Sequence, residues 1–316
     1  MSRSMFVSKN VLIIVLVSTL VIIIASPIGF SIWENYHSKY SYGEIVIHKD
    51  RDFKKYNFPG SGTENDPYII ENLILSTQKR YAIFIGDTTS FFVIRNCEII
   101  FNQIGIYLNN IKRGTAKIEN NIMEYKQAYY YSNLQSIVVY FASDIVICNN
   151  TCSFDNEIYT SGYGITIYDS RNSIIANNTC FGFLIGIEVT SGSDFSTIEN
   201  NLCQFNDRGI IIRSDSCVIY HNTLKYNSDY GVSLYYCDYN HIYHNNFIDN
   251  HYILNNNNRS QGYEKRKSYT SYNNRWYDAT LQEGNYWSNL NWTEEAIYEM
   301  EGSIHIFDIY PLQYPI

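Results

Sequence analysis

The phrase Ile118-Glu119-Asn120-Asn121-Ile122-Met123 is one copy of a short repeat that decides the fold of this chain. Seven copies lie between residues 94 and 247: IRNCEI at 94–99, IENNIM at 118–123, ICNNTC at 147–152, IANNTC at 175–180, IENNLC at 198–203, IYHNTL at 219–224 and IYHNNF at 242–247. Successive copies start 21 to 29 residues apart, and an internal period of this length is typical of a solenoid, in which each repeat forms one structural unit.

A second phrase in most repeats indicates which solenoid to expect. It begins with glycine and alternates apolar with other residues, as in Gly105-Ile106-Tyr107-Leu108 and Gly209-Ile210-Ile211-Ile212. Alternation with a period of two, bounded by Gly, Asn, Asp and Ser, predicts short strands separated by turns. The recurring apolar residues are mostly Ile and Val, not the Leu of a leucine-rich repeat. We therefore predict an all-β chain folded as a right-handed parallel β-helix with one coil per repeat.

The recurring asparagine has a physical role in such a coil. Asparagine tolerates the left-handed backbone conformation of a sharp corner, and its side-chain amide can bond to the same amide in the next coil. Coils stack at the spacing of paired strands, about 4.8 Å. The sequence therefore predicts one internal ladder of amides and one inward column of isoleucines. The ladder is Asn121, Asn150, Asn178, Asn201, Asn222 and Asn245, and the column is Ile118, Ile147, Ile175, Ile198, Ile219 and Ile242.

The N-terminus predicts a location outside the cytoplasm. Arg3 and Lys9 precede an uncharged apolar run over residues 11–30, which is the layout of a secretory signal or a membrane anchor. The run is near the ~20 residues that span a bilayer and lacks a clear cleavage site, which favours the uncleaved anchor. A net charge of -8 without a basic patch argues against a nucleic-acid partner.

Four segments follow from these patterns. We expect a membrane anchor or signal segment over residues 1–30, a linker over 31–56, the β-helix repeats over 57–254, and a C-terminal loop and aromatic cap over 255–316. Caps are needed because an open β-helix exposes strand edges and apolar core at both ends. Trp276 and Trp287 in the tail are expected to pack in such a cap, although exposed rings there could also stack on a sugar.

The segments that flank the repeats resemble a known family. They read GSGTENDPYII at 60–70, NRW at 274–276, GNYWS at 284–288 and DIYPL at 308–312. Together with the repeats they resemble NosD-type right-handed parallel β-helix proteins, a group common among archaeal cell-surface proteins, over about residues 58 to 313. Relatives usually carry a stretch like a calcium loop after the Tyr-Trp-Ser motif, whereas this chain has NWTEEA at 291–296. The resemblance therefore gives no ground for calcium here.

Polysaccharide-active enzymes share this fold, so catalysis is one hypothesis. Glycoside hydrolysis needs two carboxylates that converge on one bond, and polyuronide lyases need an aspartate-bound calcium beside a basic residue. The recurring acids Asp169, Asp194, Asp215 and Asp238 instead follow the strands at unequal offsets, as acids in solvated turns do. The sequence predicts no catalytic residue, and we expect a protein that is not an enzyme.

Metal handling is a second hypothesis, implied by the resemblance, because NosD acts in the maturation of a copper site in a periplasmic reductase. His221 and His244 fall at the same position of adjacent repeats, and imidazole is a good ligand for copper or zinc. The alternative is that both histidines replace the asparagine found at this corner in the other coils, at Asn120, Asn149, Asn177 and Asn200. If the histidines only replace asparagine, we expect no resident cofactor.

A surface module that binds glycans or partner proteins is the function we favour from the sequence. The chain has 31 tyrosines, more than a core of this kind needs. Equivalent residues of stacked coils form columns, and aromatic columns suit glycans or partner proteins. The alternative is that tyrosine merely favours strands. The candidate ligand-binding residues at outward positions are Tyr107, Tyr168, Tyr220, Tyr235 and Tyr243.

Overall fold

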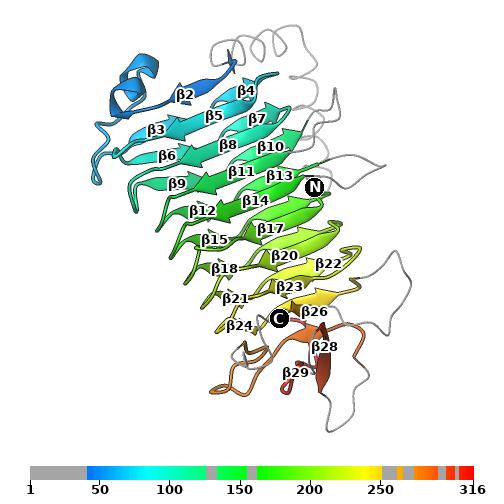
Figure 1. Ribbon diagram of the computed structural model, residues 1–316. Helices are drawn as coiled ribbons and strands as arrows, with labels where there is room; N and C mark the ends of the chain where they lie inside the picture. The colour runs from blue at the N-terminus through cyan, green and yellow to red at the C-terminus, as the bar shows by residue number, and fades with distance from the viewer. Residues whose placement is uncertain are drawn as a thin grey trace, which may run out of the picture. The chain divides into compact units, whose positions relative to one another are not determined.

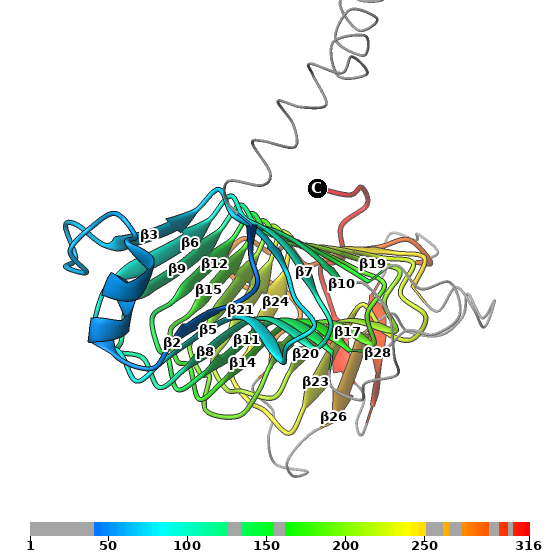
Figure 2. The same ribbon diagram turned by 90° about the horizontal axis from the view of Figure 1, so that it is seen from above.

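The chain folds as a parallel β-helix in the computed structural model, which describes residues 41–125, 134–154, 162–250, 262–265, 274–290, 297–302 and 306–316. Successive coils stack along one axis (Figure 1), and the view from above shows three sheets around a common core (Figure 2). In every pairing of consecutive coils the strands run parallel, and the one antiparallel pair of named strands in the described part is β28 with β29. The predicted all-β parallel β-helix is confirmed.

Each complete coil contributes one strand to each sheet, and the incomplete coils at the two ends make the sheets unequal in strand number. The ten-stranded sheet contains, in spatial order, β1 (Ser41–Tyr42), β4 (Ile74–Ser76), β7 (Glu98–Phe101), β10 (Ile122–Tyr125), β13 (Thr151–Ser153), β16 (Thr179–Phe181), β19 (Leu202–Gln204), β22 (Thr223–Lys225), β25 (Asn246–Ile248) and β27 (Tyr286–Trp287). The eight-stranded sheet contains β24 (His241–Tyr243), β21 (Val218–Tyr220), β18 (Thr197–Glu199), β15 (Ile174–Ala176), β12 (Val146–Cys148), β9 (Ala116–Glu119), β6 (Phe92–Arg95) and β3 (Tyr68–Glu71).

The eleven-stranded sheet is formed by the strands of the second sequence phrase and lies in front in Figure 1. It contains β2 (Ile45–Ile47), β5 (Tyr81–Gly86), β8 (Ile104–Asn109), β11 (Gln135–Tyr140), β14 (Tyr163–Tyr168), β17 (Ile185–Val189), β20 (Arg208–Ile212), β23 (Val232–Tyr235), β26 (Gly262–Lys265), β28 (Tyr298–Gly302) and β29 (Ile306–Asp308).

The isoleucine of the repeat phrase forms the predicted inward column. Ile147 pairs with Ile118 and Ile175, and Ile198 pairs with Ile175 and Ile219, so equivalent side chains stack from coil to coil. All six members of the column are buried. On the ten-stranded sheet the core side holds Cys152, Cys180 and Cys203, which are paired in register, buried and free of disulfide bonds.

The predicted asparagine ladder is present at the corner between the eight-stranded and ten-stranded sheets. Each Nδ2 donates to the Oδ1 of the next coil, from Asn121 to Asn150 at 2.9 Å and onward to Asn245. The ladder continues beyond the repeats, because Asn245 donates to Asn285 at 3.0 Å and Asn285 donates to Asp308 at 3.3 Å. Two shorter amide ladders, which the sequence analysis missed, join Asn206 to Asn227 and Asn250, and Asn240 to Asn274.

The prediction of a linker over residues 31–56 is wrong for its described part. β2 pairs in parallel with β5 and buries Ile45 and Ile47. The short 3-10 helix η1 (Asp50–Tyr56) follows and places Phe53 against the ring of Tyr68 at 4.4 Å, over the open end of the core. The sequence does not indicate this packing, because Ile45, Ile47 and Phe53 stand among lysines and aspartates and give no local pattern of burial. They are buried because they pack against the open end of the first coil.

The C-terminal tail closes the other end of the core. Trp276 and Trp287 are both buried, and Trp287 stacks on Phe247 at 4.0 Å and on Tyr298 at 3.9 Å. These rings therefore pack in the cap and do not form an exposed sugar-stacking surface. The tail predicted as loop and cap over residues 255–316 also contains strands that extend two of the sheets.

The motif residues that suggested a family have clear roles at this end. Gly284 leaves room for the carboxyl of Asp308, because a Cβ there would lie 1.9 Å from Oδ1 of Asp308. Trp287 Nε1 donates to Asp308 at 2.9 Å, and Asn285 continues the ladder. The buried carboxyl group of Asp308 thus holds the tail segments 284–288 and 308–312 together through hydrogen bonds.

The predicted anchor or signal segment over residues 1–30 lies outside the described residues and stays a prediction. In the part of the chain that the structure describes, no helix has the length and apolar character needed to cross a membrane.

Candidate functional site

A row of aromatic side chains lies on the outer face of the eleven-stranded sheet. The ring of Tyr81 lies 5.2 Å from that of Tyr107, Tyr107 lies 6.0 Å from Tyr140, and Tyr140 stacks on Tyr168 at 4.2 Å with nearly parallel planes. Phe84 joins the row at 5.6 Å from Tyr107. Strand alternation directs Tyr107, Tyr140 and Tyr168 outward, while their neighbours Ile106, Val139 and Ile167 point into the core. Tyr81 is the first residue of β5 and is partly exposed.

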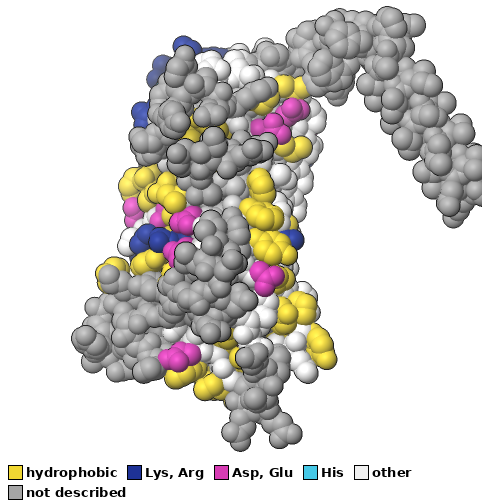
Figure 3. Space-filling model, turned by 90° about the vertical axis from the view of Figure 1, so that its right-hand side faces the viewer, with side chains coloured by type: hydrophobic (Ala, Val, Ile, Leu, Met, Phe, Trp, Pro, Cys, Tyr) yellow, Lys and Arg dark blue, Asp and Glu magenta, His cyan; other side chains and the backbone are white. Residues whose placement is uncertain are grey.

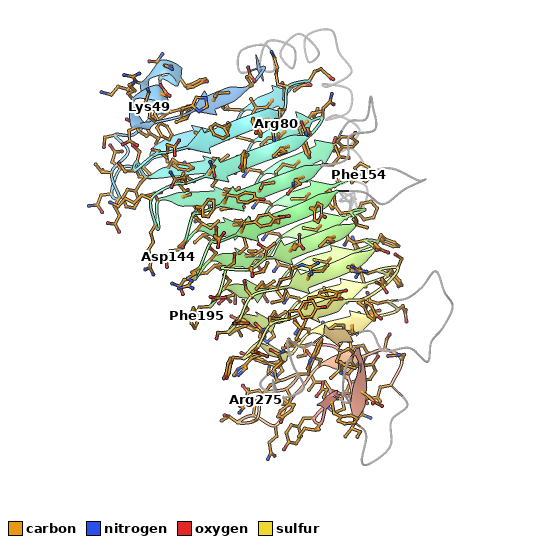
Figure 4. The ribbon with its side chains drawn as sticks, viewed as in Figure 1. Lys49, Arg80, Asp144, Phe154, Phe195 and Arg275 are labelled. Atoms are coloured by element: carbon orange, nitrogen blue, oxygen red, sulfur yellow. The ribbon has the colours of Figure 1, made fainter. Side chains whose placement is uncertain are left out.

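Charged side chains lie at both ends of this row. The guanidinium of Arg80, labelled in Figure 4, lies 5.1 Å from the Tyr81 ring. At the other end Arg213 Nε donates to Glu188 at 3.0 Å and lies 4.6 Å from the ring of Tyr235. The side chain of Glu188 is only 8% exposed. Burial raises the pKa of Tyr168, and the nearby Glu188 carboxylate raises it further, so this phenol stays neutral and can donate a hydrogen bond.

Several exposed aromatic residues at the coil corners have a left-handed backbone. Phe141 follows β11 with a φ of 52°, in the left-handed region that Asn or Gly usually occupies, and it is 55% exposed. Equivalent corners in neighbouring coils hold Asn110 and Asp169. Phe195, labelled in Figure 4, and Phe205 share this conformation. An exposed aromatic residue held in a strained conformation is a candidate for a functional role, because the strain costs about 1–3 kcal/mol.

Hydrophobic side chains are also exposed along the right-hand side of the molecule in Figure 3. At the corner between the ten-stranded and eleven-stranded sheets, Phe205 lies 5.6 Å from Phe181 and stacks on Tyr226 at 5.2 Å. The aromatic surface is therefore not confined to one sheet, although the eleven-stranded sheet carries its longest continuous row in the described residues.

The structure divides the five predicted ligand-binding tyrosines between two faces. Tyr107 and Tyr168 lie in the aromatic row on the eleven-stranded sheet, and Tyr235 lies on the same sheet three strands beyond Tyr168. Tyr220 and Tyr243 lie on the eight-stranded sheet, where their rings stack at 5.6 Å and the Tyr220 hydroxyl donates to Glu199. The two groups lie on different sheets, and only Tyr107 and Tyr168 are part of the aromatic row.

Sequence reasoning missed Tyr81, Phe84, Tyr140, Glu188 and Arg213. Tyr140 was missed because its strand carries Ser136 where the other strands carry the marker glycine, so the repeat phrase was not recognised there. An alignment of the strands by their inward isoleucines and valines would have found it, because Tyr140 pairs with Tyr168 in register.

His221 and His244 are neighbours, as predicted. Their rings stack at 5.3 Å with an angle of 7° between the planes, and His244 Nε2 lies 2.6 Å from Oε2 of Glu283. Burial lowers the pKa of His221, and the nearby His244 lowers it further. Both residues have a left-handed backbone, with φ of 54° and 53°, the conformation of the asparagines at the same corner in the other coils.

The arrangement of these histidines does not fit a copper or zinc site. The lone pair of an imidazole nitrogen lies in the plane of its ring, so two stacked parallel rings do not direct their lone pairs at one ion. Within the described ranges, no group of three or more His, Cys, Asp or Glu side chains is placed to hold a metal ion. The corner therefore supports the interpretation of histidine as a replacement for asparagine.

Replacing both His221 and His244 by asparagine should leave the free energy of unfolding within about 0.5 kcal/mol of the parent, because asparagine suits the left-handed corner. Isothermal titration of copper into the purified protein should show only weak binding before the change and weaker binding after it. Submicromolar copper binding that disappears in the double variant would contradict this assignment and favour a metal-handling protein.

The recurring aspartates have structural contacts. Asp194 Oδ1 accepts the backbone N–H of Asp215 at 3.0 Å, and Asp215 Oδ1 accepts that of Asp238 at 2.8 Å. Asp194 also pairs with Arg171 at 3.2 Å. These carboxylates bond to the next coil at a corner, as turn residues do.

The fold and this surface define the chain as a parallel β-helix repeat protein with an aromatic outer face. Residues 135–291 match the family model described as NosD, periplasmic copper-binding protein. The chain is accordingly a NosD-type parallel β-helix protein. No curated protein and no solved structure matches it.

Proposed function

We propose that the chain is an extracytoplasmic, non-catalytic module that binds a glycan along the outer face of the eleven-stranded sheet. The description of the matching family as periplasmic supports a location outside the cytoplasm. The observation that carries the glycan proposal is the aromatic row of Tyr81, Tyr107, Tyr140 and Tyr168, which continues over four successive coils.

The chemistry of the row suits a polysaccharide. The apolar face of a sugar ring packs on an aromatic ring, and a tyrosine hydroxyl at the ring edge can bond to a sugar hydroxyl. Stacked coils repeat the rings at about the 4.8 Å strand spacing, so the row is extended along the axis and suits an extended polymer. The strained, exposed Phe141 lies 6.1 Å from Tyr140 and widens the row toward the corner.

The absence of catalysis is part of the proposal. Hydrolysis requires two carboxylates that reach one bond from opposite sides. The carboxylates of Asp194 and Asp215 accept backbone hydrogen bonds at the corner, and that of Glu188 accepts from Arg213. These contacts support a binding role in which the acids shape the surface.

Phe141→Asn tests the binding proposal with a variant that should not harm the fold. Asparagine at a left-handed position relieves backbone strain, so the free energy of unfolding should rise by about 1 kcal/mol. Glycan affinity, measured by calorimetry against a panel of polysaccharides and oligosaccharides, should fall. Tyr140→Ala should reduce it by tenfold or more, because the ring contacts both Tyr107 and Tyr168.

Tyr243→Ala is the matched control, since it removes a stacked tyrosine from the eight-stranded sheet. It should leave glycan affinity unchanged. If no glycan binds, or if Tyr243→Ala weakens binding as much as Tyr140→Ala does, the proposal fails. A partner protein whose binding depends on Tyr140 would then be the better assignment for this face.

Copper handling is the second candidate function. It rests on the printed description of the family and on the adjacent imidazoles of His221 and His244. The titration of the double asparagine variant described above decides it.

A further inference from the structure

The outer face of the eleven-stranded sheet has a central column of smaller side chains that runs from β11 to β23, toward the C-terminal coils. Pairing in register places Val138, Thr166, Glu188, Ile211 and Ser233 one after another from β11 to β23. All five alternate with core residues and therefore point outward, yet all are buried. On four of these five strands a longer residue flanks the column at the next outward position, namely Tyr140, Tyr168, Arg213 and Tyr235.

Two hydroxyl groups in this column lack hydrogen-bond partners. Neither Oγ1 of Thr166 nor Oγ of Ser233 has a partner in the described residues, and both side chains are fully buried. Buried polar groups almost always have partners, so an unpaired one needs an explanation, and a missing ligand is one. Glu188 lies next to Thr166 in register and two coils from Ser233.

The charges around the column cancel. Glu188 pairs with Arg213 at 3.0 Å, and Asp229 pairs with Arg208 at 2.9 Å. Tyr163 and Tyr168 flank the column and lie close enough to Glu188 for its charge to raise the pKa of each phenol, although burial is the larger cause for both. The surface therefore offers neutral phenols and paired ions, with no excess charge to attract or repel an ionic ligand.

We infer that this column, between β14 and β23, is the subsite that recognises the hydroxyl groups of the bound glycan, and that the glycan is uncharged. The inference rests on the proposed function and adds the class of ligand. Glu188 accepts from one sugar hydroxyl, Arg213 donates to another, and Thr166 and Ser233 gain the partners that they lack. Such paired donors and acceptors fix the orientation of a ligand that aromatic stacking alone would leave free to slide.

Access to the two hydroxyl groups requires a side chain to move. The side chain of Arg213 is 38% exposed and is held by one carboxylate and one ring face. Arg213 flanks the column between Glu188 and Ser233, so we assign it as the group that turns aside there; it can keep its bond to Glu188 or exchange it for a sugar hydroxyl. Binding should therefore be accompanied by a change in the environment of Tyr235, which Arg213 covers.

Thr166→Val combined with Ser233→Ala separates a ligand role from a structural one. Removing two buried, unpaired hydroxyls should raise the thermal unfolding temperature, because their desolvation is no longer uncompensated. The same change should weaken binding of neutral hexose oligosaccharides at least tenfold. Thr197→Val, the same replacement on the eight-stranded sheet, is the control and should leave binding unchanged. A double variant that is more stable and binds with full affinity would overturn the subsite.

The class of ligand is tested with two matched sets of oligosaccharides, one of neutral hexoses and one of uronic acids. The parent protein should bind the neutral set, with little change in affinity between low and high salt. Glu188→Gln should weaken that binding tenfold or more. If uronic-acid oligosaccharides bind more tightly and lose affinity with salt, the inference is wrong while the proposed function stands. If neither set of oligosaccharides binds to the parent protein, the proposed function itself has failed.

Discussion

Replacing Asn201 by leucine should lower the free energy of unfolding by about 4 kcal/mol, because two or more buried polar groups lose their partners and each costs about 1–3 kcal/mol. The Nδ2 of Asn201 donates to the carbonyl of Ile175 at 2.8 Å and to Asn222 at 3.0 Å. Its Oδ1 accepts from both the backbone and the side chain of Asn178, at 2.9 and 3.1 Å. Leucine fills a similar volume and replaces none of these bonds.

Urea unfolding followed by circular dichroism measures this loss. Asn200→Gly is the matched control, because Asn200 is the exposed neighbour with a left-handed φ of 54°, a conformation that glycine adopts without strain. The control should change stability by well under 1 kcal/mol. Equal losses in the two variants would show that the corner backbone, and not the buried ladder, holds the coils together.

Stability should fall by about 3 kcal/mol as the pH rises from about 4 to about 7, through the carboxyl of Asp308 alone. Burial raises the pKa of this group from 3.8 to about 6, although Asn285 N–H, Trp287 Nε1 and Tyr310 N–H all donate to it. The folded state then holds the proton more tightly than the unfolded state does. The stabilisation is complete below the unfolded pKa of about 4 and is lost as the pH passes the folded pKa of about 6.

The difference in unfolding free energy between the parent and Asp308→Asn, measured at several pH values, isolates this group. The parent should lose stability relative to the variant across the interval from pH 4 to pH 6, and the difference should be constant above pH 7. Asp278→Asn is a control of opposite sign. Backbone N–H groups of Leu281 and Thr280 lower the pKa of Asp278, so its contribution is lost on acidification. A flat difference for Asp308 would mean that the carboxyl is solvated and does not close the ladder.

The candidate site was predicted in part. The outward tyrosines Tyr107, Tyr168 and Tyr235 were found because the repeat phrase gives their strand and the period of two gives their face. Tyr220 and Tyr243 were found in the same way, yet the structure places them on another sheet. A period of two distinguishes inward from outward side chains within one strand. It does not indicate which of the three sheets that strand joins.

Contacts between distant coils explain what the sequence could not show at this site. Glu188 and Arg213 are 25 residues apart and carry no local pattern, and they meet only because one coil lies directly on the next. Whether the hydroxyls of Thr166 and Ser233 have hydrogen-bond partners depends on side chains from neighbouring coils, which the sequence does not place. The linker predicted over residues 31–56 does not account for the burial of Phe53 for a similar reason, since that ring needs the open end of a coil to pack on.

The sequence by itself determined the coil, its period, the inward isoleucines and the amide ladder, because each depends on local spacing repeated seven times. Tertiary structure alone decided how the ladder ends at Asp308, that residues 45–56 close the N-terminal end of the core, and which outward side chains share a surface. Those features depend on stacking, which brings residues one coil apart to about 4.8 Å whatever their separation along the chain. A repeating pattern fixes the repeating part of a solenoid, whereas its ends and its surface depend on residues that occur once.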